Sequence, residues 1–260
     1  MKQTGERPLK DSTPGALVAL HDAGYREIRA RIRPGVVLDV GCGVGDESIR
    51  LALEDSIVIG VDYDVDTALA AQKNGVRATC ADGSILPLRT GSVDAVCSSH
   101  IIEHFIDPEL HVAEVARVTK DEGAVFFLTP NEPADFENPF HVYLFTPTSL
   151  QTMLRRYFAD VEVMGLDGDD AVHEDFDARR RTGNRLLALD IFDLRKKLPR
   201  SWYIALHAFG RRVIYPITNR KKGDATKITE NNFFVTPVLS EKTLVLFAVA
   251  KNPIRSLLAP

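Results

Sequence analysis

Residues 100–104 read His-Ile-Ile-Glu-His, a pattern whose side chains could bind a metal ion. In one class of zinc proteases, two His residues four positions apart on one helix bind zinc, and a Glu between them acts as a general base. That arrangement needs a continuous helix and a third ligand downstream, for which Glu174 is the available candidate. The pentapeptide instead precedes Asp107-Pro108, a helix start that leaves barely one turn after the preceding strand. We therefore predict no zinc site in the pentapeptide.

His141 is a second candidate for acid–base chemistry. An Asn-Pro pair before it predicts a rigid turn, and a Thr-Pro pair after it predicts the start of a helix. A hydroxyl group is a poor nucleophile at neutral pH, so its attack benefits from a base that titrates near pH 7, as His does. We interpret His141 as a candidate general base. The alternative is that it only orders its loop.

A glycine-rich loop follows the first apolar run, residues 35–41. Gly41, Gly43 and Gly45 allow the backbone to turn tightly and to approach a ligand, and the next helix would offer unpaired N–H groups at its N-terminus. A dinucleotide-binding fingerprint would need a glycine where Asp46 stands, and no Lys-Ser or Lys-Thr pair follows as in a P-loop. The loop therefore predicts a ligand of another kind.

The stretch from Asp39 to Gly45, with glycine at positions 41, 43 and 45, resembles motif I of class I S-adenosylmethionine-dependent methyltransferases. Asp62 and Asp82, each at the end of a predicted strand, stand where that family has acidic residues. The resemblance covers roughly residues 13–166 and 242–252. It implies S-adenosyl-L-methionine as the cofactor and methyl transfer as the reaction.

The resemblance also implies which residues contact the cofactor. Asp62 would accept hydrogen bonds from both ribose hydroxyls, and Asp82 from the adenine amino group. Ile85 and Leu86 would flank the adenine ring, on which Tyr63 would stack. The full expected set is Asp39, Gly41, Cys42, Gly43, Gly45, Asp62, Tyr63, Asp82, Gly83, Ser99 and His100.

Residues 93–131 resemble the small-molecule, type 11-like branch of the family, in which the fourth strand precedes a short turn carrying Glu-His. Under this resemblance the end of that strand lines the methionine end of the cofactor, and Glu103 and His104 brace the floor of the site. The alternative is that Glu103 and His104 only form hydrogen bonds with local backbone groups. The catalytic candidates are thus His141, Glu103 and His104.

Residues 138–150 resemble a loop in family members that methylate sugars and related hydroxyls. The expected function is an S-adenosylmethionine-dependent O-methyltransferase for a small polar acceptor, foremost a sugar or saccharide that could be lipid-linked. A quinone, lipid or other natural product is the alternative acceptor, and a catalytically silent cofactor-binding scaffold is the alternative from another class. A Mg²⁺ ion could polarise a diol with help from Glu103, Asp135 or Glu137, but no ligand spacing requires one.

These side chains need a fold that brings loops together. Short apolar runs alternate with amphipathic segments, which is typical of an α/β, Rossmann-like, doubly wound parallel sheet with helices on both faces. Ligands of such sheets bind beyond the carboxyl ends of the strands. Seven strands are predicted at 35–41, 56–64, 76–83, 92–99, 124–131, 159–166 and 242–252, and helices at 12–32, 46–54, 65–75, 107–123 and 146–158.

We expect three regions: a core at 1–167, a helical, basic cap at 168–237 over the acceptor side, and a return to the core at 238–260. Residues 170–237 contain 14 Lys and Arg against 8 Asp and Glu, whereas the remainder of the chain is acidic. We expect the cap to act as a lid and as the surface of a homo-oligomer; a membrane-surface patch is an alternative. The acidic remainder would repel a phosphate backbone, so no nucleic acid partner is expected.

The composition indicates a globular protein, with 45% hydrophobic and 26% charged residues and a formal net charge of −4. Three cysteines at no metal-ligand spacing favour a reducing compartment over a disulfide framework. The polar N-terminus does not resemble a signal peptide, and no run approaches the ~18 apolar residues of a membrane span. We expect a cytoplasmic protein without an integral membrane segment.

Overall fold

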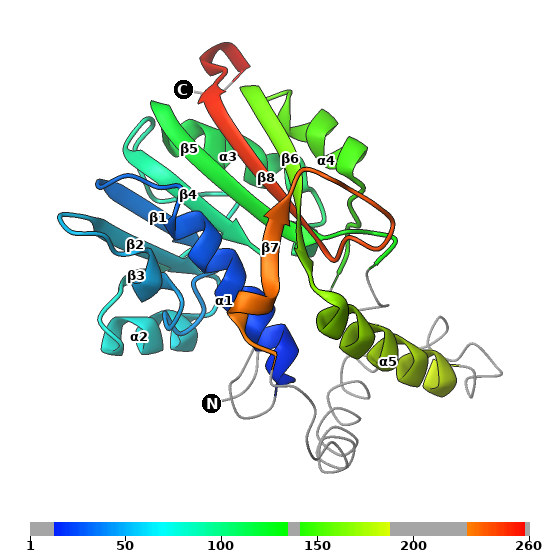
Figure 1. Ribbon diagram of the computed structural model, residues 1–260. Helices are drawn as coiled ribbons and strands as arrows, with labels where there is room; N and C mark the ends of the chain where they lie inside the picture. The colour runs from blue at the N-terminus through cyan, green and yellow to red at the C-terminus, as the bar shows by residue number, and fades with distance from the viewer. Residues whose placement is uncertain (1–12, 135–140, 188–227, 258–260) are drawn as a thin grey trace.

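The computed structural model describes residues 13–134, 141–187 and 228–257, and their arrangement is shown in Figure 1. The strands are β1 (Val36–Val40), β2 (Ile57–Asp62), β3 (Arg77–Cys80), β4 (Val93–Ser99), β5 (Thr119–Pro130), β6 (Phe158–Gly168), β7 (Phe233–Thr236) and β8 (Val245–Pro253). They form one sheet in the order β3-β2-β1-β4-β5-β8-β6-β7. Neighbours from β3 to β5 are parallel, whereas β8 runs antiparallel to β5 and β6, and β7 antiparallel to β6.

The α-helices are α1 (Gly15–Arg29), α2 (Val65–Lys73), α3 (Pro108–Val118), α4 (Pro147–Leu154) and α5 (Asp170–Leu187). Short 3-10 turns are η1 (Ser48–Leu51), η2 (Ile102–His104), η3 (Glu230–Asn232) and η4 (Arg255–Leu257). In Figure 1, α1 crosses the near face of the sheet, and α3 and α4 lie behind it. Within the described ranges, no helix is both long and apolar enough to cross a membrane.

Two hydrophobic cores lie on opposite faces of the sheet, because successive side chains of a strand point to opposite sides. On β5, Phe126 and Leu128 belong to the core under α1, whereas Val125 and Phe127 belong to the core under α3 and α4. All four are at most 1% exposed. Burial on both faces explains why the central strands are continuous apolar runs. The α/β architecture expected from the sequence is confirmed.

The sheet differs from the prediction in having eight strands and in being mixed instead of parallel. The extra strand, β7, lies inside the range 168–237 that we expected to form a helical cap, and it pairs with residues 165–168 of β6. Phe233 of β7 is 2% exposed and belongs to the core under α1, so burial of this side chain favours the strand. Helix α5 agrees with the helical prediction for the start of the cap. Residues 188–227 lie outside the described residues.

The helix expected at 46–54 is only the single turn η1. Arg29 of α1 donates hydrogen bonds to the carbonyl oxygens of Arg50 and Ala52, and it thereby caps the turn at its end. Ser48, at the start of η1, donates to the buried carboxylate of Asp39 at 2.6 Å. These tertiary contacts hold the segment as a short connection between β1 and β2.

Helix α3 ends at Val118 and not at Gly123, and β5 begins directly afterwards. Thr119 Oγ1 donates to the carbonyl oxygen of Val115 at 2.6 Å at this junction, and β-branched residues favour the strand conformation that follows. A Cβ atom on Gly123 would lie 3.0 Å from the carbonyl oxygen of Asp94. Gly123 therefore allows close backbone packing within the sheet instead of terminating a helix.

Candidate active site

The loop after β1 forms the first wall of the candidate site. Gly43 and Gly45 have φ values of +56° and +85°, a region in which residues with a Cβ atom are strained. A Cβ atom on Gly45 would lie 2.7 Å from Val76, whereas one on Gly43 would meet no atom within 4 Å. Cys42 is 5% exposed and packs against Ala71 of α2, so its side chain belongs to a small buried cluster. The loop thus presents an open surface of backbone groups at Gly43.

Asp62 lies at the end of β2, directly beside this loop. Its Oδ2 atom accepts a hydrogen bond from the Gly43 N–H at 3.0 Å, and its Oδ1 atom accepts one from the Asp64 N–H at 2.9 Å. Each carboxylate oxygen can accept a further hydrogen bond, and the side chain is only half-buried. This arrangement suits the expected role of Asp62, which is to accept hydrogen bonds from the ribose hydroxyls.

Asp39 lies beneath the loop and is fully buried. Its Oδ2 atom accepts a 2.6 Å hydrogen bond from Ser48 Oγ, and both carboxylate oxygens lie 3.2 Å from the donating hydroxyl of Tyr25 in α1. Burial raises the pKa of Asp39 to about 6, and hydrogen bonds from Ser48, Cys97 and Tyr25 oppose this rise only in part. Asp39 therefore positions α1 and η1 around the site, and the cofactor contact implied by the resemblance stays a prediction.

The loop after β3 contains the residues expected at the adenine ring. Asp82 is exposed, and its Oδ1 atom accepts hydrogen bonds from the N–H and the hydroxyl of Ser84 at 2.8 and 2.7 Å. Tyr63 and Ile85 are 81% and 73% exposed, so both offer apolar surface to a flat ring. Leu86 is 4% exposed and packs in the core under α3. The expectation that Leu86 flanks a ring is therefore wrong.

His111 of α3 fixes this loop, although no sequence motif pointed to this residue. Its Nδ1–H donates to the carbonyl oxygen of Gly83 at 2.8 Å, so its Nε2 atom accepts from Ser98 Oγ at 2.8 Å. Burial lowers the pKa of His111 to about 4, which keeps the ring neutral at pH 7. A Cβ atom on Gly83 would lie 2.9 Å from Phe105, so this glycine serves packing. The only signal in the sequence was a His on the apolar face of a predicted helix.

The end of β4 adjoins the glycine loop, because β1 and β4 are neighbours in the sheet. Ser99 is 8% exposed, and within the described residues neither its Oγ atom nor the Nε2 atom of His100 has a hydrogen-bond partner. His100 has a φ of +53°, and the ring of His21 in α1 lies 4.4 Å from its ring, centroid to centroid. Buried polar atoms normally have partners, and strained backbone collects at functional sites, so a ligand is expected here.

Glu103 in η2 is 1% exposed. Its Oε2 atom accepts a hydrogen bond from Thr129 Oγ1 at 3.1 Å. Its Oε1 atom lies 3.5 Å from His100 Nδ1, too far for a strong hydrogen bond, and has no hydrogen-bond partner among the described residues. Burial acts to raise the pKa of Glu103, but His100, His104 and His141 together hold it below its usual value. The carboxylate is therefore ionised at neutral pH.

His104 and His141 meet although they are far apart in the sequence. Their ring centroids are 5.4 Å apart. The carbonyl oxygen of Glu103 accepts hydrogen bonds from the N–H groups of Val142 and Tyr143 at 2.8 and 3.1 Å, which holds the segment after residue 140 against η2. Glu103, His104 and His141 each place one potential ligand atom within 4.8 Å of the others. The three catalytic candidates thus form one cluster.

The pentapeptide 100–104 does not form the helix that the zinc-protease arrangement needs. Strand β4 ends at Ser99, and only the three residues of η2 are helical before α3 begins. Glu174, the third ligand in that arrangement, lies on α5. The Asn-Pro turn before His141 and two of the acidic residues considered for Mg²⁺, Asp135 and Glu137, lie outside the described residues.

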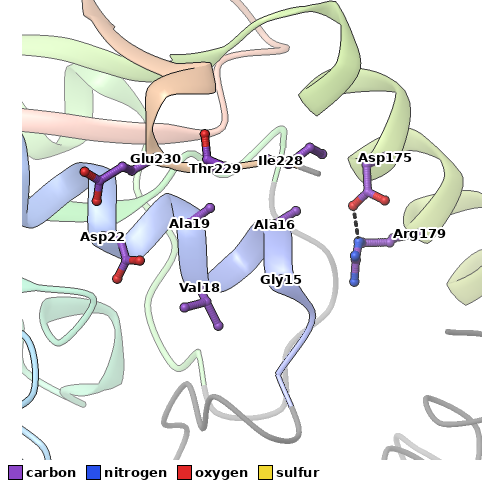
Figure 2. Close-up of a pocket in the computed structure, with 10 residues that line it drawn as sticks. All are labelled: Gly15, Ala16, Val18, Ala19, Asp22, Asp175, Arg179, Ile228, Thr229 and Glu230. Atoms are coloured by element: carbon purple, nitrogen blue, oxygen red, sulfur yellow. Dashed lines mark hydrogen bonds and ion pairs between the residues drawn. The ribbon is translucent and has the colours of Figure 1, made fainter. Parts of the chain in front are cut away.

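A pocket of about 520 Å³ opens between α1, α5 and the segment before β7 (Figure 2). Apolar side chains such as Ala16, Ala19 and Ile228 line it together with charged ones. On one wall, Asp175 pairs with Arg179 at 2.5 Å. On the other, Asp22 and Glu230 both pair with Arg50, at 3.4 and 2.9 Å. Helix α1 therefore contributes both to this pocket and, through His21, to the end of β4.

Comparisons with known proteins match part of this chain to a protein family. Residues 38–127 match the methyltransferase domain family. A probable S-adenosylmethionine-dependent methyltransferase of Mycolicibacterium smegmatis is 31% identical over 150 residues, which cover 55% of this chain and 58% of that protein. A ubiquinone biosynthesis O-methyltransferase of Coxiella burnetii is 32% identical over 47% of this chain and 52% of its own length. A demethylmenaquinone methyltransferase of Corynebacterium urealyticum is 32% identical over 45% of this chain and 52% of its own length.

The chain thus spans a little over half the length of these curated relatives. Among solved structures, a methyltransferase of Thermotoga maritima, described as a possible histamine N-methyltransferase, matches 91% of both chains with a TM-score of 0.58 and 14% identity. Phosphoethanolamine N-methyltransferase 2 of Haemonchus contortus matches 89% of this chain and 52% of that chain, with a TM-score of 0.52 and 17% identity. At such identities the structures show a shared fold.

Proposed function

We propose that this chain, which contains a class I S-adenosylmethionine-dependent methyltransferase domain, transfers a methyl group to a hydroxyl of a small-molecule acceptor. The observation that carries the proposal is the juxtaposition of the glycine loop with the partnerless polar atoms of Ser99 and His100 within the described residues. The two loops are in contact, since a Cβ atom on Gly41 would lie 3.0 Å from Ile101. The match of residues 38–127 to the methyltransferase domain supports methyl transfer as the reaction at such a site.

The described residues fit the cofactor. The open face at Gly43 leaves room for it beside the backbone, and the carboxylate of Asp62 has lone pairs for the ribose hydroxyls. Ser99 Oγ and His100 Nε2 would bind the polar groups of its methionine part. When bound, S-adenosylmethionine supplies a methyl group on a positively charged sulfur, which is already activated for transfer.

His141 is the leading candidate for accepting the proton of the acceptor hydroxyl. It is half-buried beside His104 and the ionised carboxylate of Glu103, whose negative charge would stabilise the imidazolium that forms. His104 would bound the acceptor on the other side. Beyond this proton transfer, the protein has mainly to hold the acceptor oxygen in line with the methyl group, which is a task of positioning.

A quinone-type compound or another natural product is the acceptor class that the comparisons favour over a saccharide. Two relatives are named for ubiquinone and menaquinone biosynthesis. The pocket between α1 and α5 offers apolar walls at Ala16, Ala19 and Ile228, which suit a hydrocarbon ring or tail better than a sugar. We propose that the non-reacting part of the acceptor binds in this pocket.

Calorimetry with S-adenosylmethionine, followed by assays of S-adenosylhomocysteine release, tests the proposal. The acceptor panel should contain catechols and quinols, sugars, and amines of similar size. We expect saturable cofactor binding and turnover with the aromatic hydroxyls. Absence of cofactor binding would instead indicate a member of the fold with another function. An amine that is turned over faster than every hydroxyl would overturn the assignment to O-methylation.

A further inference from the structure

Glu103, His104 and His141 combine one carboxylate with two imidazoles, and each places one potential ligand atom within 4.8 Å of the others. Two His and one carboxylate are the ligand set of many catalytic sites for first-row divalent ions, in which the remaining coordination positions stay open. The sequence pattern His-x-x-Glu-His pointed to His100 and His104 as a ligand pair. The structure replaces His100 in this set by His141.

The carboxylate of Glu103 is built into the fold as a ligand would be. The residue is 1% exposed, and Thr129 Oγ1, itself fully buried, donates to its Oε2 atom at 3.1 Å. Its Oε1 atom is buried and has no hydrogen-bond partner in the described part of the chain, where His100 Nδ1 lies 3.5 Å from it. A hydrogen bond that fixes one oxygen while the other stays available is typical of the outer shell of metal sites.

The backbone holds the third ligand in place. The carbonyl oxygen of Glu103 accepts hydrogen bonds from the N–H groups of Val142 and Tyr143 at 2.8 and 3.1 Å, so the residue next to Val142 cannot drift away from η2. A tetrahedral ion with ligands at ~2.0–2.1 Å needs its donor atoms roughly 3.3 Å apart. Because His104 and His141 are only half-buried, rotation of their side chains can close the gap from 4.8 Å.

We propose that Glu103, His104 and His141 bind one divalent first-row transition ion such as Zn²⁺. Two imidazoles favour this class over Mg²⁺, which prefers oxygen ligands. The role of the ion rests on the proposed function: it would bind the acceptor hydroxyl at an open position and lower its pKa, and the proton would pass to solvent. In the metal-loaded protein His141 is then a ligand, and the ion performs the task of the base.

The test is titration of the metal-stripped full-length protein with Co²⁺, without cofactor or acceptor, followed by competition with Zn²⁺. We expect one ion per chain and visible absorption bands typical of imidazole ligation. His141→Ala should weaken Co²⁺ binding by at least about tenfold, as loss of even outer-shell partners does. His173→Ala is the matched control, because His173 of α5 pairs with Asp167 of β6 and does not belong to the cluster, and this variant should bind as wild type does.

Two further variants keep the result decisive. His100→Ala should retain the Co²⁺ spectrum, because His100 is not a ligand in this proposal. Glu103→Gln should lose it while unfolding at a temperature close to that of wild type, because Gln can still accept from Thr129. Absence of Co²⁺ binding, or equal binding by His141→Ala, would overturn the inference. Methyl transfer that continues in metal-free protein would leave the proposed function intact, whereas metal binding without cofactor binding would leave only the metal site.

Discussion

The two sides of the carboxyl edge of the sheet are assembled in different ways. On the proposed cofactor side, Gly43 follows β1, Asp62 ends β2 and Asp82 follows β3, and hydrogen bonds between neighbouring segments, such as Gly43 N–H to Asp62, hold them. On the proposed acceptor side, Glu103 and His104 meet His141 from another loop, and a pocket lies between α1, α5 and the segment before β7. The first side depends on short-range order and the second on long-range packing.

Because of this difference, we expect separate effects of mutations on cofactor binding and on the rate of methyl transfer. A change on the cofactor side should weaken the affinity for S-adenosylmethionine, whereas a change on the acceptor side should leave that affinity unchanged and slow the reaction. Asp39 and Tyr25 connect the sides, since the Tyr25 hydroxyl of α1 donates to the buried carboxylate under the glycine loop. Variants in each region therefore test whether the two sides act separately in binding and in turnover.

His141→Ala should have the largest effect. We expect turnover to fall by ~10²–10⁴, the range for a lost general base, while the dissociation constant for S-adenosylmethionine stays within about threefold. Steady-state kinetics and calorimetry on the same preparation measure the two quantities. If turnover survives in this variant but disappears in His100→Ala or Glu103→Ala, the proton acceptor belongs to the turn after β4.

Asp62→Ala should show the opposite pattern. We expect a loss of about 2–4 kcal/mol in the binding free energy of S-adenosylmethionine, because the ribose hydroxyls lose a charged acceptor and the Gly43 N–H loses its partner. At saturating cofactor, the turnover number should change far less. Wild-type affinity in this variant would show that the loop after β2 does not hold the ribose.

Asp39 should make stability depend on pH. Its folded-state pKa of about 6 lies above the ordinary value of 3.8, so the folded protein holds the proton more tightly than the unfolded chain does. This contribution is present below about pH 4 and is lost as the pH rises through 6, a change of about 2–3 kcal/mol.

Denaturant unfolding of wild type and Asp39→Asn at several pH values checks this effect of Asp39. The free energy of unfolding of wild type should decline relative to that of the variant between pH 4 and 7. Parallel curves would mean that the carboxylate is not buried as described.

Tyr25→Phe should have the smallest effect. Loss of the shared hydrogen bond to Asp39 should cost about 1 kcal/mol in the free energy of unfolding, since the ring itself stays buried. Cofactor affinity should fall by less than in Asp62→Ala. If Tyr25→Phe lowers the free energy of cofactor binding by more than the free energy of unfolding, the contact of α1 beneath the glycine loop contributes directly to cofactor binding.

Local signals accounted for the parts of the fold that neighbouring residues decide. Asp107-Pro108 and Thr146-Pro147 marked the starts of α3 and α4, because a cap and a fixed proline φ act within one turn. The end of α3 and the failure of the helix at 46–54 were missed. Both depend on tertiary contacts, namely the pairing of β5 in the sheet and the hydrogen bonds from Arg29.

The roles of single residues followed the same division. Exposed Ile85 and buried Leu86 are adjacent and chemically alike, so only the packing of the chain could tell which one faces a ligand. His111 gave no pattern distinct from that of an ordinary core position, yet it joins Gly83 to Ser98. Strand β7 was hidden because its partner β6 is far away in the sequence.

Adjacent residues were sufficient to predict the α/β class, the glycine loop and the acidic residues at the end of β2 and after β3, because periodicity, turn chemistry and strand ends are local properties of the chain. Three-dimensional contacts were needed to bring His141 to Glu103 and His104, since η2 is too short to stack the two His of the pentapeptide on one helix. Backbone hydrogen bonds from Val142 and Tyr143 to Glu103 bring the third side chain in from a distant loop, and no local pattern encodes that contact.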